Sequence, residues 1–333
     1  MSEVSQPGGV QPRIALVGAA GAVGLSIAAA LRAEGTPYRV IGRSHEHLRS
    51  AFGDDPLAEI KAWNLDDGLS TRQALTGIDT AIYLIGVNYW QFELHPILMR
   101  KIVESAQLAG VRRMLLIGTV YPYGRPQADP VTEEHPRNPH TFKGRMRKEQ
   151  EDILFAAHEK GKIQACELRL PDFYGPDVDK SFLWSAFLAA KNGGRAQLIG
   201  PIDMPHQFVF VPDVGPLVSR LLKTDEAWGH TWHFAGSGTS TQREIVNKIF
   251  AVTCRRPKLI VAGKTTLRLM GLFNPLMREM VEMHYLQTNP VLMDDTRLTR
   301  LLGGIQRTSY DEGIRLVLES GTANDRNVVH AVE

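Results

Sequence analysis

The stretch "VGAAGAVG", residues 17–24, restricts the fold most, because it sets three glycines between a short apolar run and an Ala-rich helical pattern. Gly18, Gly21 and Gly24 have the spacing GxxGxxG. Glycines at such a turn let the backbone bend sharply and approach a pyrophosphate, whose charge sits at the N-terminus of the following helix. Between a strand and a helix near the start of the chain, the pattern predicts a dinucleotide-binding unit. A tight turn in an unrelated α/β protein is the alternative.

Short apolar runs and helical patterns keep alternating up to about residue 170, where the last run is "IQACELRL". This alternation predicts an α/β fold of the Rossmann type, a doubly wound parallel sheet with helices on both faces. After Pro171 the regularity is lost, and helical patterns with scattered methionines follow. We therefore expect a flexible tail at 1–10, a Rossmann domain at 11–170 joined by parts of 205–235, and a smaller, mostly helical substrate-binding lobe at 171–330.

Charge and composition exclude several classes of partner. The chain of 333 residues has 38 basic and 36 acidic side chains, so its net charge of +2 gives no overall field that would attract nucleic acid or anionic lipid. Two distant cysteines, Cys166 and Cys254, predict neither a disulfide framework nor a zinc site. No stretch reaches the roughly 18 apolar residues that span a bilayer, and the N-terminus lacks an apolar signal region. We expect a cytoplasmic protein with a small-molecule substrate and no nucleic-acid, membrane or metal partner.

The end of the second expected strand indicates which dinucleotide binds. An NAD enzyme needs an acidic residue there for the ribose 2′-hydroxyl, but the sequence is "IGRS", with Arg43 and Ser44 after Gly42. A guanidinium beside a hydroxyl suits a 2′-phosphate, so NADP(H) is favoured over NAD(H). A merely solvated Arg43 is the alternative. At the end of the third strand, Asn64 and the adjacent Leu65 are expected to contact the adenine.

Several motifs together resemble the extended short-chain dehydrogenase/reductase family, the NAD-dependent epimerase/dehydratase type, from about residue 13 to 320. "YLIG" at 83–86 looks like the family's HLAA turn, "IGTVYPYGRP" like its SSxxVYG segment, and "LRLPDFYGPD" like the run that lines the nicotinamide. "HQFVFVPDVG" and "DDTRLTRLLGG" resemble later family segments. The resemblance implies Thr119 at the catalytic Ser/Thr position. It implies further cofactor contacts at Ala20, Ala22, Val23, Leu84, Ile85, Gly86, Pro171, Asp172 and Phe173.

The match fails at the family's catalytic Tyr-x-x-x-Lys pair. A glutamate four residues past the lysine sets the register, and Glu151 then places Lys143 at the tyrosine position and Arg147 at the lysine position. The general acid/base phenol is therefore replaced. Arginine can bond ribose hydroxyls, but its pKa above about 12 makes it a poor proton donor. The family's helix asparagine is also replaced, by His95.

Three explanations for these cations stay open. In the first, they belong to a solvated helix face with an i,i+4 pair such as Arg147–Glu151. In the second, Lys143 is the proton donor. In the third, Lys143 and Arg147 bind the cofactor ribose or a substrate anion, while Tyr121 or Tyr123 transfers protons. The candidate catalytic residues are thus Thr119, Lys143, Arg147 and Tyr121. The candidate substrate contacts are Tyr89, His95, Tyr123 and His206.

The function that we expect is hydride transfer by an NADP(H)-binding oxidoreductase or epimerase-like enzyme, on a sugar-like or alcohol/ketone substrate, with a non-standard proton donor. The resemblance implies the reaction class, and the sequence does not identify the substrate. The alternative is a non-catalytic NADP-sensing or protein-interaction module of the same fold. A homodimer is left open.

Overall fold

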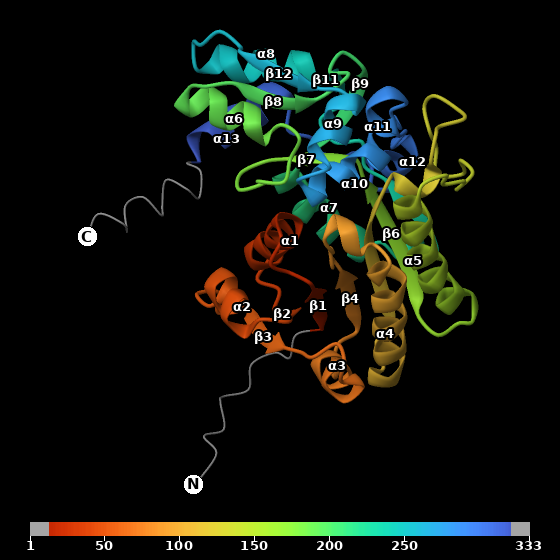
Figure 1. Cartoon of the computed structure of the whole chain (residues 1–333). Coiled ribbons are helices and arrows are strands. Elements are labelled where there is room, and N and C mark those ends of the chain that lie inside the picture. Colours follow the sequence, from red (N-terminus) through yellow and green to blue (C-terminus); the bar gives the residue numbers. More distant parts are fainter. Residues whose placement is uncertain (1–12, 321–333) are drawn as a thin grey trace.

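A seven-stranded parallel sheet forms the centre of the molecule in the computed structural model, which describes residues 13–320 (Figure 1). The expected tail at 1–10 and the outer ends of the two expected domains lie outside the described residues. The strand order is β10-β6-β5-β4-β1-β2-β3. The expected α/β fold with a doubly wound parallel sheet is confirmed. The strands are β1 Ile14–Val17, β2 Tyr38–Gly42, β3 Ala58–Ala62, β4 Thr80–Tyr83, β5 Arg113–Thr119, β6 Gln164–Leu170 and β10 Thr231–His233.

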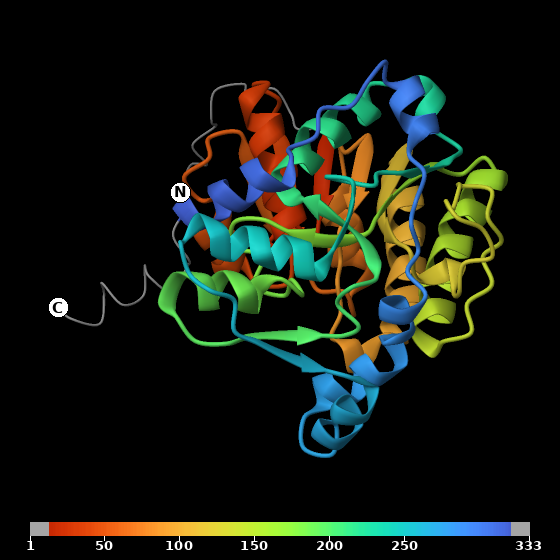
Figure 2. The same cartoon turned by 90° about the horizontal axis from the view of Figure 1, so that it is seen from above.

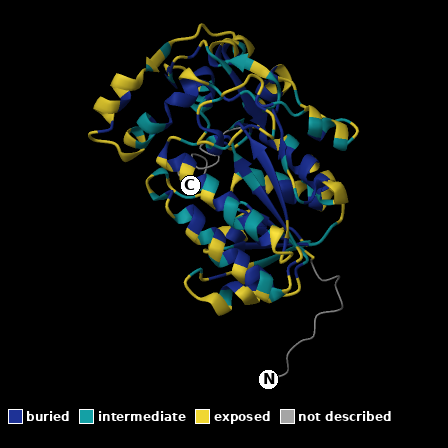
Figure 3. Ribbon diagram, turned by 90° about the vertical axis from the view of Figure 1, so that its right-hand side faces the viewer, coloured by how far each residue is buried: buried dark blue, intermediate teal, exposed yellow. Residues whose placement is uncertain are grey.

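Helices cover both faces of this sheet, because successive side chains of a strand point to opposite faces. In β1, Leu16 belongs to an apolar cluster with residues of α1, α2 and α7, whereas Ala15 and Val17 belong to a second cluster with α3, α4 and α5. The inner strands are accordingly buried on both sides, whereas the edge strand β3 is partly exposed (Figure 3). The helices are α1 Ala22–Ala33, α2 His45–Phe52, α3 Gly68–Leu75, α4 Leu94–Ala109, α5 Phe142–Glu159 and α7 Val214–Leu222.

The order of the strands fixes where a ligand can bind. Strand β1 lies between β2 and β4, so the chain winds outward in opposite directions from the β1/β4 boundary. Parallel sheets bind ligands in the crevice at the carboxyl ends of the strands at such a switch point. The glycine loop, residues 18–24, follows β1 at this crevice.

The C-terminal lobe lies over the carboxyl ends of the central strands and contains more strands than the sequence predicts (Figure 1). Two small sheets, β11-β9-β7 and β12-β8, stand among its helices. These strands have three to six residues, too few for a clear period. The lobe comprises β7 Asp172–Tyr174, β8 Ala196–Ile199, β9 Pro205–Phe210, β11 Thr239–Thr241, β12 Leu259–Ala262, α6 Trp184–Asn192, α8 Gln242–Val252, α9 Lys264–Met270, α10 Pro275–Met283, α11 Tyr285–Thr288, α12 Thr296–Leu301 and α13 Tyr310–Glu319.

The chain returns from the lobe to the central sheet. Helix α7 packs beside α1, and β10 adds to the edge of the sheet next to β6. The division into a Rossmann domain and a substrate lobe near residue 170 stays a prediction. Within residues 13–320, no helix is both long enough and apolar enough to cross a bilayer.

Candidate active site

The three glycines of the loop after β1 have different structural roles. Gly18 has φ +84°, and its N–H donates to the Ile41 carbonyl at 2.8 Å. A Cβ at Gly24 would lie 2.7 Å from the carbonyl carbon of Ala19, so Gly24 allows the helix to start against the loop. A Cβ at Gly21 would meet no atom within 4 Å. The fold needs Gly18 and Gly24, whereas the space at Gly21 is left free.

The N-terminus of α1 offers unpaired backbone N–H groups to this space. Its N-cap residue, Gly21, forms no side-chain cap, and the first turn, which begins at Ala22, carries no acidic residue. Helix N-termini with free N–H groups attract phosphate because the partial positive charge of the helix dipole lies there. The glycine loop therefore fits a pyrophosphate.

The other expected cofactor residues surround the same crevice. Leu84, Ile85 and Gly86 directly follow β4, and a Cβ at Gly86 would again meet open space. Ala20, Val23 and Phe173 are partly buried against the core cluster of the α1 side. Pro171 and Asp172 follow β6 and line the pocket described below.

The residues expected at the adenosine end are exposed. Arg43 is exposed and forms no ion pair with any residue of 13–320. The Ser44 hydroxyl caps α2 by accepting from the His47 N–H at 3.2 Å. The Asn64 side-chain oxygen accepts from the Asp66 N–H at 3.0 Å, which leaves its amide group as the free donor, and Leu65 beside it is half-buried. Arg43 is thus free for an anionic ligand.

A small pocket of about 20 Å³ lies at the carboxyl ends of β5 and β6, under the C-terminal lobe. Thr119 ends β5, Tyr121 follows in a short 3-10 helix (Tyr121–Tyr123), Asp172 begins β7, and His206 is in β9. With Pro171, which follows β6, the pocket brings together five of the residues that the sequence singles out. Its lining residues are Thr119, Val120, Tyr121, Pro171, Asp172, His206, Gln207, Leu286 and Val291.

Two half-buried tyrosines form a pair at this pocket. The Tyr121 hydroxyl lies 2.8 Å from the hydroxyl of Tyr89, which is in the 3-10 helix Tyr89–Gln91. Burial raises the pKa of both phenols, and that of Tyr121 lies well above its ordinary value. Both hydroxyls therefore keep their protons at neutral pH and act as hydrogen-bond donors or acceptors.

A histidine and a carboxylate form the second pair. His206 Nε2 lies 2.6 Å from Asp172 Oδ2, and the histidine makes no other hydrogen bond within the described chain. A carboxylate that accepts from one ring nitrogen fixes the tautomer and orientation of the imidazole. The other nitrogen, Nδ1, is then the acceptor, as in a general base.

Lys143, at the position of the family's catalytic tyrosine, is buried and its ammonium group is engaged in ion pairs. Its side chain is 1% exposed, and its ammonium forms ion pairs with Glu282, at 2.7 Å, and with Glu279. Both carboxylates come from α10, three residues apart on one helical face. The ammonium also lies 5.7 Å from the centre of the Phe92 ring. Lys143 thus ties the start of α5 to the lobe.

Arg147 is also buried, one turn further along α5. Its guanidinium donates to His95 Nδ1 at 3.3 Å and to the Ile117 carbonyl at 3.4 Å. Burial and, to a smaller extent, the nearby guanidinium lower the pKa of His95 to about 2, so this imidazole is neutral. Burial also lowers the pKa of Arg147 itself. Arg147 is the residue that contacts the strand end beside the pocket.

The four cations of α5 divide into a buried pair and an outer pair, in accord with the helical period. Lys143 and Arg147 are buried, whereas Arg145 is exposed and Lys148 is half-exposed. The i,i+4 ion pair joins Lys148 to Asp152 at 2.7 Å. Glu151 is buried and forms ion pairs through Oε2 with Arg169 at 2.6 Å and Arg137 at 3.1 Å, and not the direct pair with Arg147 that a solvated face would give.

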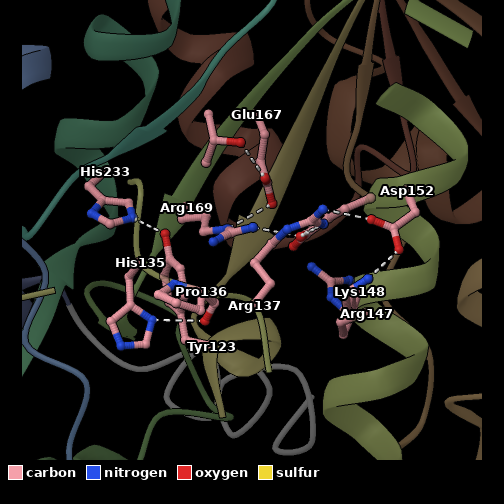
Figure 4. Close-up of polar contacts among 12 residues, drawn as sticks. Tyr123, His135, Pro136, Arg137, Arg147, Lys148, Asp152, Glu167, Arg169 and His233 are labelled. Atoms are coloured by element: carbon pink, nitrogen blue, oxygen red, sulfur yellow. Dashed lines mark hydrogen bonds and ion pairs between the residues drawn. The ribbon is translucent and has the colours of Figure 1, made fainter. Parts of the chain in front are cut away.

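Tyr123 belongs to a buried structural network rather than to the pocket lining (Figure 4). Its hydroxyl lies 2.6 Å from His233 Nε2, and the Arg169 guanidinium lies 4.3 Å from its ring centre. Arg169 in turn lies between Glu151 and Glu167, and all three are buried. Buried charges need such partners, because an unpaired charge in the core is costly.

Sequence patterns miss several residues of this site. Glu279 and Glu282 contact Lys143 across more than a hundred residues of chain, and Gln207 and Leu286 line the pocket. The three-residue spacing of the two glutamates was the available signal, because it puts both carboxylates on one helical face. No group of His, Cys, Asp and Glu within residues 13–320 has the arrangement of a metal site.

Comparisons with known proteins agree with this geometry. The NAD dependent epimerase/dehydratase family matches residues 14–234. No curated protein sequence matches the chain.

Solved structures match nearly the whole chain. "MoeE5 in complex with UDP-glucuronic acid and NAD" has a TM-score of 0.75 at 19% identity, over 94% of this chain and 99% of that one. A UDP-N-acetylglucosamine 4-epimerase from Bacillus cereus has a TM-score of 0.73 at 17% identity, over 93% and 100%. A dTDP-glucose 4,6-dehydratase from Bacillus anthracis, in complex with NAD, has a TM-score of 0.77 at 12% identity, over 93% and 96%.

At these identities the solved structures establish the fold. The match to the family covers about two thirds of the chain and includes the glycine loop, β5 and α5. The expected class, an enzyme that uses a nicotinamide cofactor, is confirmed at the level of the family. The chain belongs to the NAD-dependent epimerase/dehydratase family.

Proposed function

We propose that this protein is an NADP(H)-dependent oxidoreductase of the epimerase/dehydratase type, which acts by hydride transfer on a sugar-like or alcohol/ketone substrate. The observation that carries the proposal is the pocket that joins Thr119, Tyr121, Asp172 and His206 at the carboxyl ends of the strands, the same edge of the parallel sheet at which the glycine loop follows β1. Neighbouring structures hold UDP-glucuronic acid with NAD, which supports a nucleotide-sugar substrate class.

The residues present fit a dinucleotide. The open space at Gly21 and the uncapped N-terminus of α1 suit a pyrophosphate, and the unpaired Arg43 suits a 2′-phosphate. Asn64 is free to donate from its amide to an adenine edge. When bound, the nicotinamide accepts or donates a hydride at the substrate carbon.

We assign the proton transfer to His206. In the oxidation of a hydroxyl group, Nδ1 takes the hydroxyl proton while Nε2–H stays bonded to Asp172, and in the reduction of a carbonyl the same proton returns to the oxygen. Tyr121 and Thr119 line the same pocket and hold the substrate oxygen by hydrogen bonds. The raised pKa of Tyr121 suits a donor that keeps its proton.

Lys143 and Arg147 receive other roles in this proposal. The two ion pairs of Lys143 to α10 make it a link between the core and the lobe. Arg147 is the cation left to contact the cofactor ribose, with His95 holding its guanidinium. Tyr89 orients Tyr121, and Tyr123 supports the sheet from within its buried network.

The test compares His206→Asn and Asp172→Asn with the parent protein, with His158→Asn as the control for a histidine outside the pocket. Each variant is titrated with NADPH and assayed by NADPH absorbance on panels of nucleotide sugars, sugars and ketones. Loss of a general base costs roughly 10²–10⁴-fold in turnover, so we expect that loss in His206→Asn with unchanged NADPH affinity. Full turnover by His206→Asn would refute the assignment.

The two ion pairs that hold Lys143 favour a second candidate function, that of a non-catalytic NADP-sensing or protein-interaction module. Stoichiometric NADPH binding by the parent protein, without turnover on any panel, would support it. A cytoplasmic location and a homodimer also stay predictions, and light scattering of the purified protein tests the second.

A further inference from the structure

Residues 254–278 carry a strong local charge that the net charge of the whole chain conceals. This segment runs from the end of α8 through β12 and α9 into α10, and it contains no Asp or Glu. All six of its basic residues are exposed, and none forms an ion pair within residues 13–320. These cations are Arg255, Arg256, Lys258, Lys264, Arg268 and Arg278.

The turn between α9 and α10 is apolar and exposed. Phe273 is 91% exposed, Leu272 68% and Leu269 63%, and Met270 and Leu276 flank them. Single exposed apolar side chains are ordinary, but five within eight residues form a patch of the kind that marks an interaction site. In Figure 2 these two helices, coloured mid-blue, project from the body of the molecule at the bottom of the view.

The fold does not need this patch. The hairpin is anchored by its other face, where Leu267, Met280 and Met283 are buried in an apolar cluster of the lobe. The residues at the tip point away from that cluster and make no core. Polar side chains at the tip would favour a hairpin surrounded by water, so the apolar side chains found there indicate that the tip contacts a binding partner.

An open cationic cavity of about 470 Å³ lies beside the hairpin. Arg125, Arg145, Lys264 and Arg268 line it together with the N-cap of α5, Thr141. Glu282 is the acidic residue in its lining, and its carboxylate is already bound to Lys143. The cavity can therefore accept an anionic group of the size of a phosphate.

We propose that this face docks on an anionic lipid bilayer. The apolar tip enters the boundary between headgroups and acyl chains, and the surrounding cations, with the cavity, contact anionic headgroups. A second copy of the chain fits poorly, because a twofold interface would bring the same six cations of each copy together. A nucleic acid would leave the aliphatic tip unburied. The net charge of +2, from which we expect no lipid partner, averages over this local excess of basic residues.

Flotation of the full-length protein with vesicles tests the proposal, with vesicles of phosphatidylcholine alone and with added phosphatidylserine. We expect binding to the anionic vesicles only, weakened by salt. Leu272→Ser should reduce it more than about tenfold, because the burial of one leucine is lost. Its control, Leu69→Ser, replaces a leucine of α3 that is 62% exposed and should bind like the parent.

A charge variant separates the electrostatic contribution. A basic residue near an anionic surface contributes about fivefold in binding, so Lys264→Gln with Arg268→Gln should lose roughly 25-fold. Lys160→Gln with Lys162→Gln, at the far end of α5, is the matched control. The proposal is overturned if the parent ignores anionic vesicles, if Leu272→Ser binds like the parent, or if Leu272→Ser instead dissolves a dimer seen by sedimentation.

Discussion

Adding a side chain at two glycines of the same loop should have different effects, on cofactor binding at one position and on stability at the other. At Gly21, with φ −90° and ψ 166°, the backbone is extended and a Cβ meets no atom within 4 Å, so valine fits the folded protein. At Gly24, a Cβ would overlap the backbone of Ala19, which cannot move without displacing the loop. We therefore predict that Gly21→Val loses cofactor binding and keeps its fold, whereas Gly24→Ala loses stability.

The magnitudes follow from these contacts. A charge-assisted hydrogen bond is worth about 1.5–3 kcal/mol, so if the valine at position 21 keeps the pyrophosphate from even one N–H of α1, NADPH affinity falls at least about tenfold. The free energy of unfolding of Gly21→Val should stay within about 0.5 kcal/mol of the parent value. Gly24→Ala adds a methyl group to a full space, which costs about 1–3 kcal/mol.

Calorimetric titration with NADPH and urea denaturation measure both quantities on each variant. Gly21→Ala, a smaller change at the same open position, should lose less affinity than Gly21→Val and serves as the graded control. A Gly21→Val protein that is folded and binds NADPH like the parent would refute the reasoning, because the pyrophosphate would then lie elsewhere. An unfolded Gly21→Val would contradict the open space seen at this residue.

Three further outcomes are expected. Arg43→Ala should remove most of the preference for NADPH over NADH, worth roughly 1.5–3 kcal/mol, and equal affinities in the parent would contradict the 2′-phosphate contact. Glu279→Gln with Glu282→Gln should lower the free energy of unfolding by about 3 kcal/mol, because Lys143 is left buried without a partner, and adding Lys143→Met should restore part of it. Stability should also decrease as the pH is lowered. Burial lowers the pKa of His233 to about 3 in the folded protein, so at pH values below the ordinary pKa of 6.5 the unfolded chain binds a proton at this histidine and the folded chain does not. By urea denaturation, the parent should lose about 2 kcal/mol more between pH 7 and pH 5 than His233→Gln does.

The sequence predicts the central fold because its signals there are local. Each of the first five strands of the sheet is a short apolar run followed by a helical pattern, and the glycine loop marks the first crossover. The lobe is less predictable, since β7 and β11 have three residues each and form through pairing with β9. Such strands exist because distant segments meet, and no window of sequence contains that information.

The candidate site also combines features that the sequence predicts locally with features that depend on the tertiary fold. The burial of Lys143 and Arg147 on one side of α5 follows from their four-residue spacing, and it is found in the structure. Their partners do not follow, because Glu279 and Glu282 reach Lys143 from a helix that only the tertiary fold brings near. The pairing of Asp172 with His206 likewise joins β7 to β9, so the proton-transfer role that we propose for it could not be inferred from either residue alone.

A crystal structure with NADP⁺ bound tests the central claim most directly. The account predicts the pyrophosphate at Gly21, the 2′-phosphate at Arg43, and the nicotinamide ring in the pocket beside Tyr121 and His206, with Lys143 still bound to α10. A nicotinamide ring outside this pocket, or Lys143 released from Glu279 and Glu282 and bonded to the ribose, would contradict it.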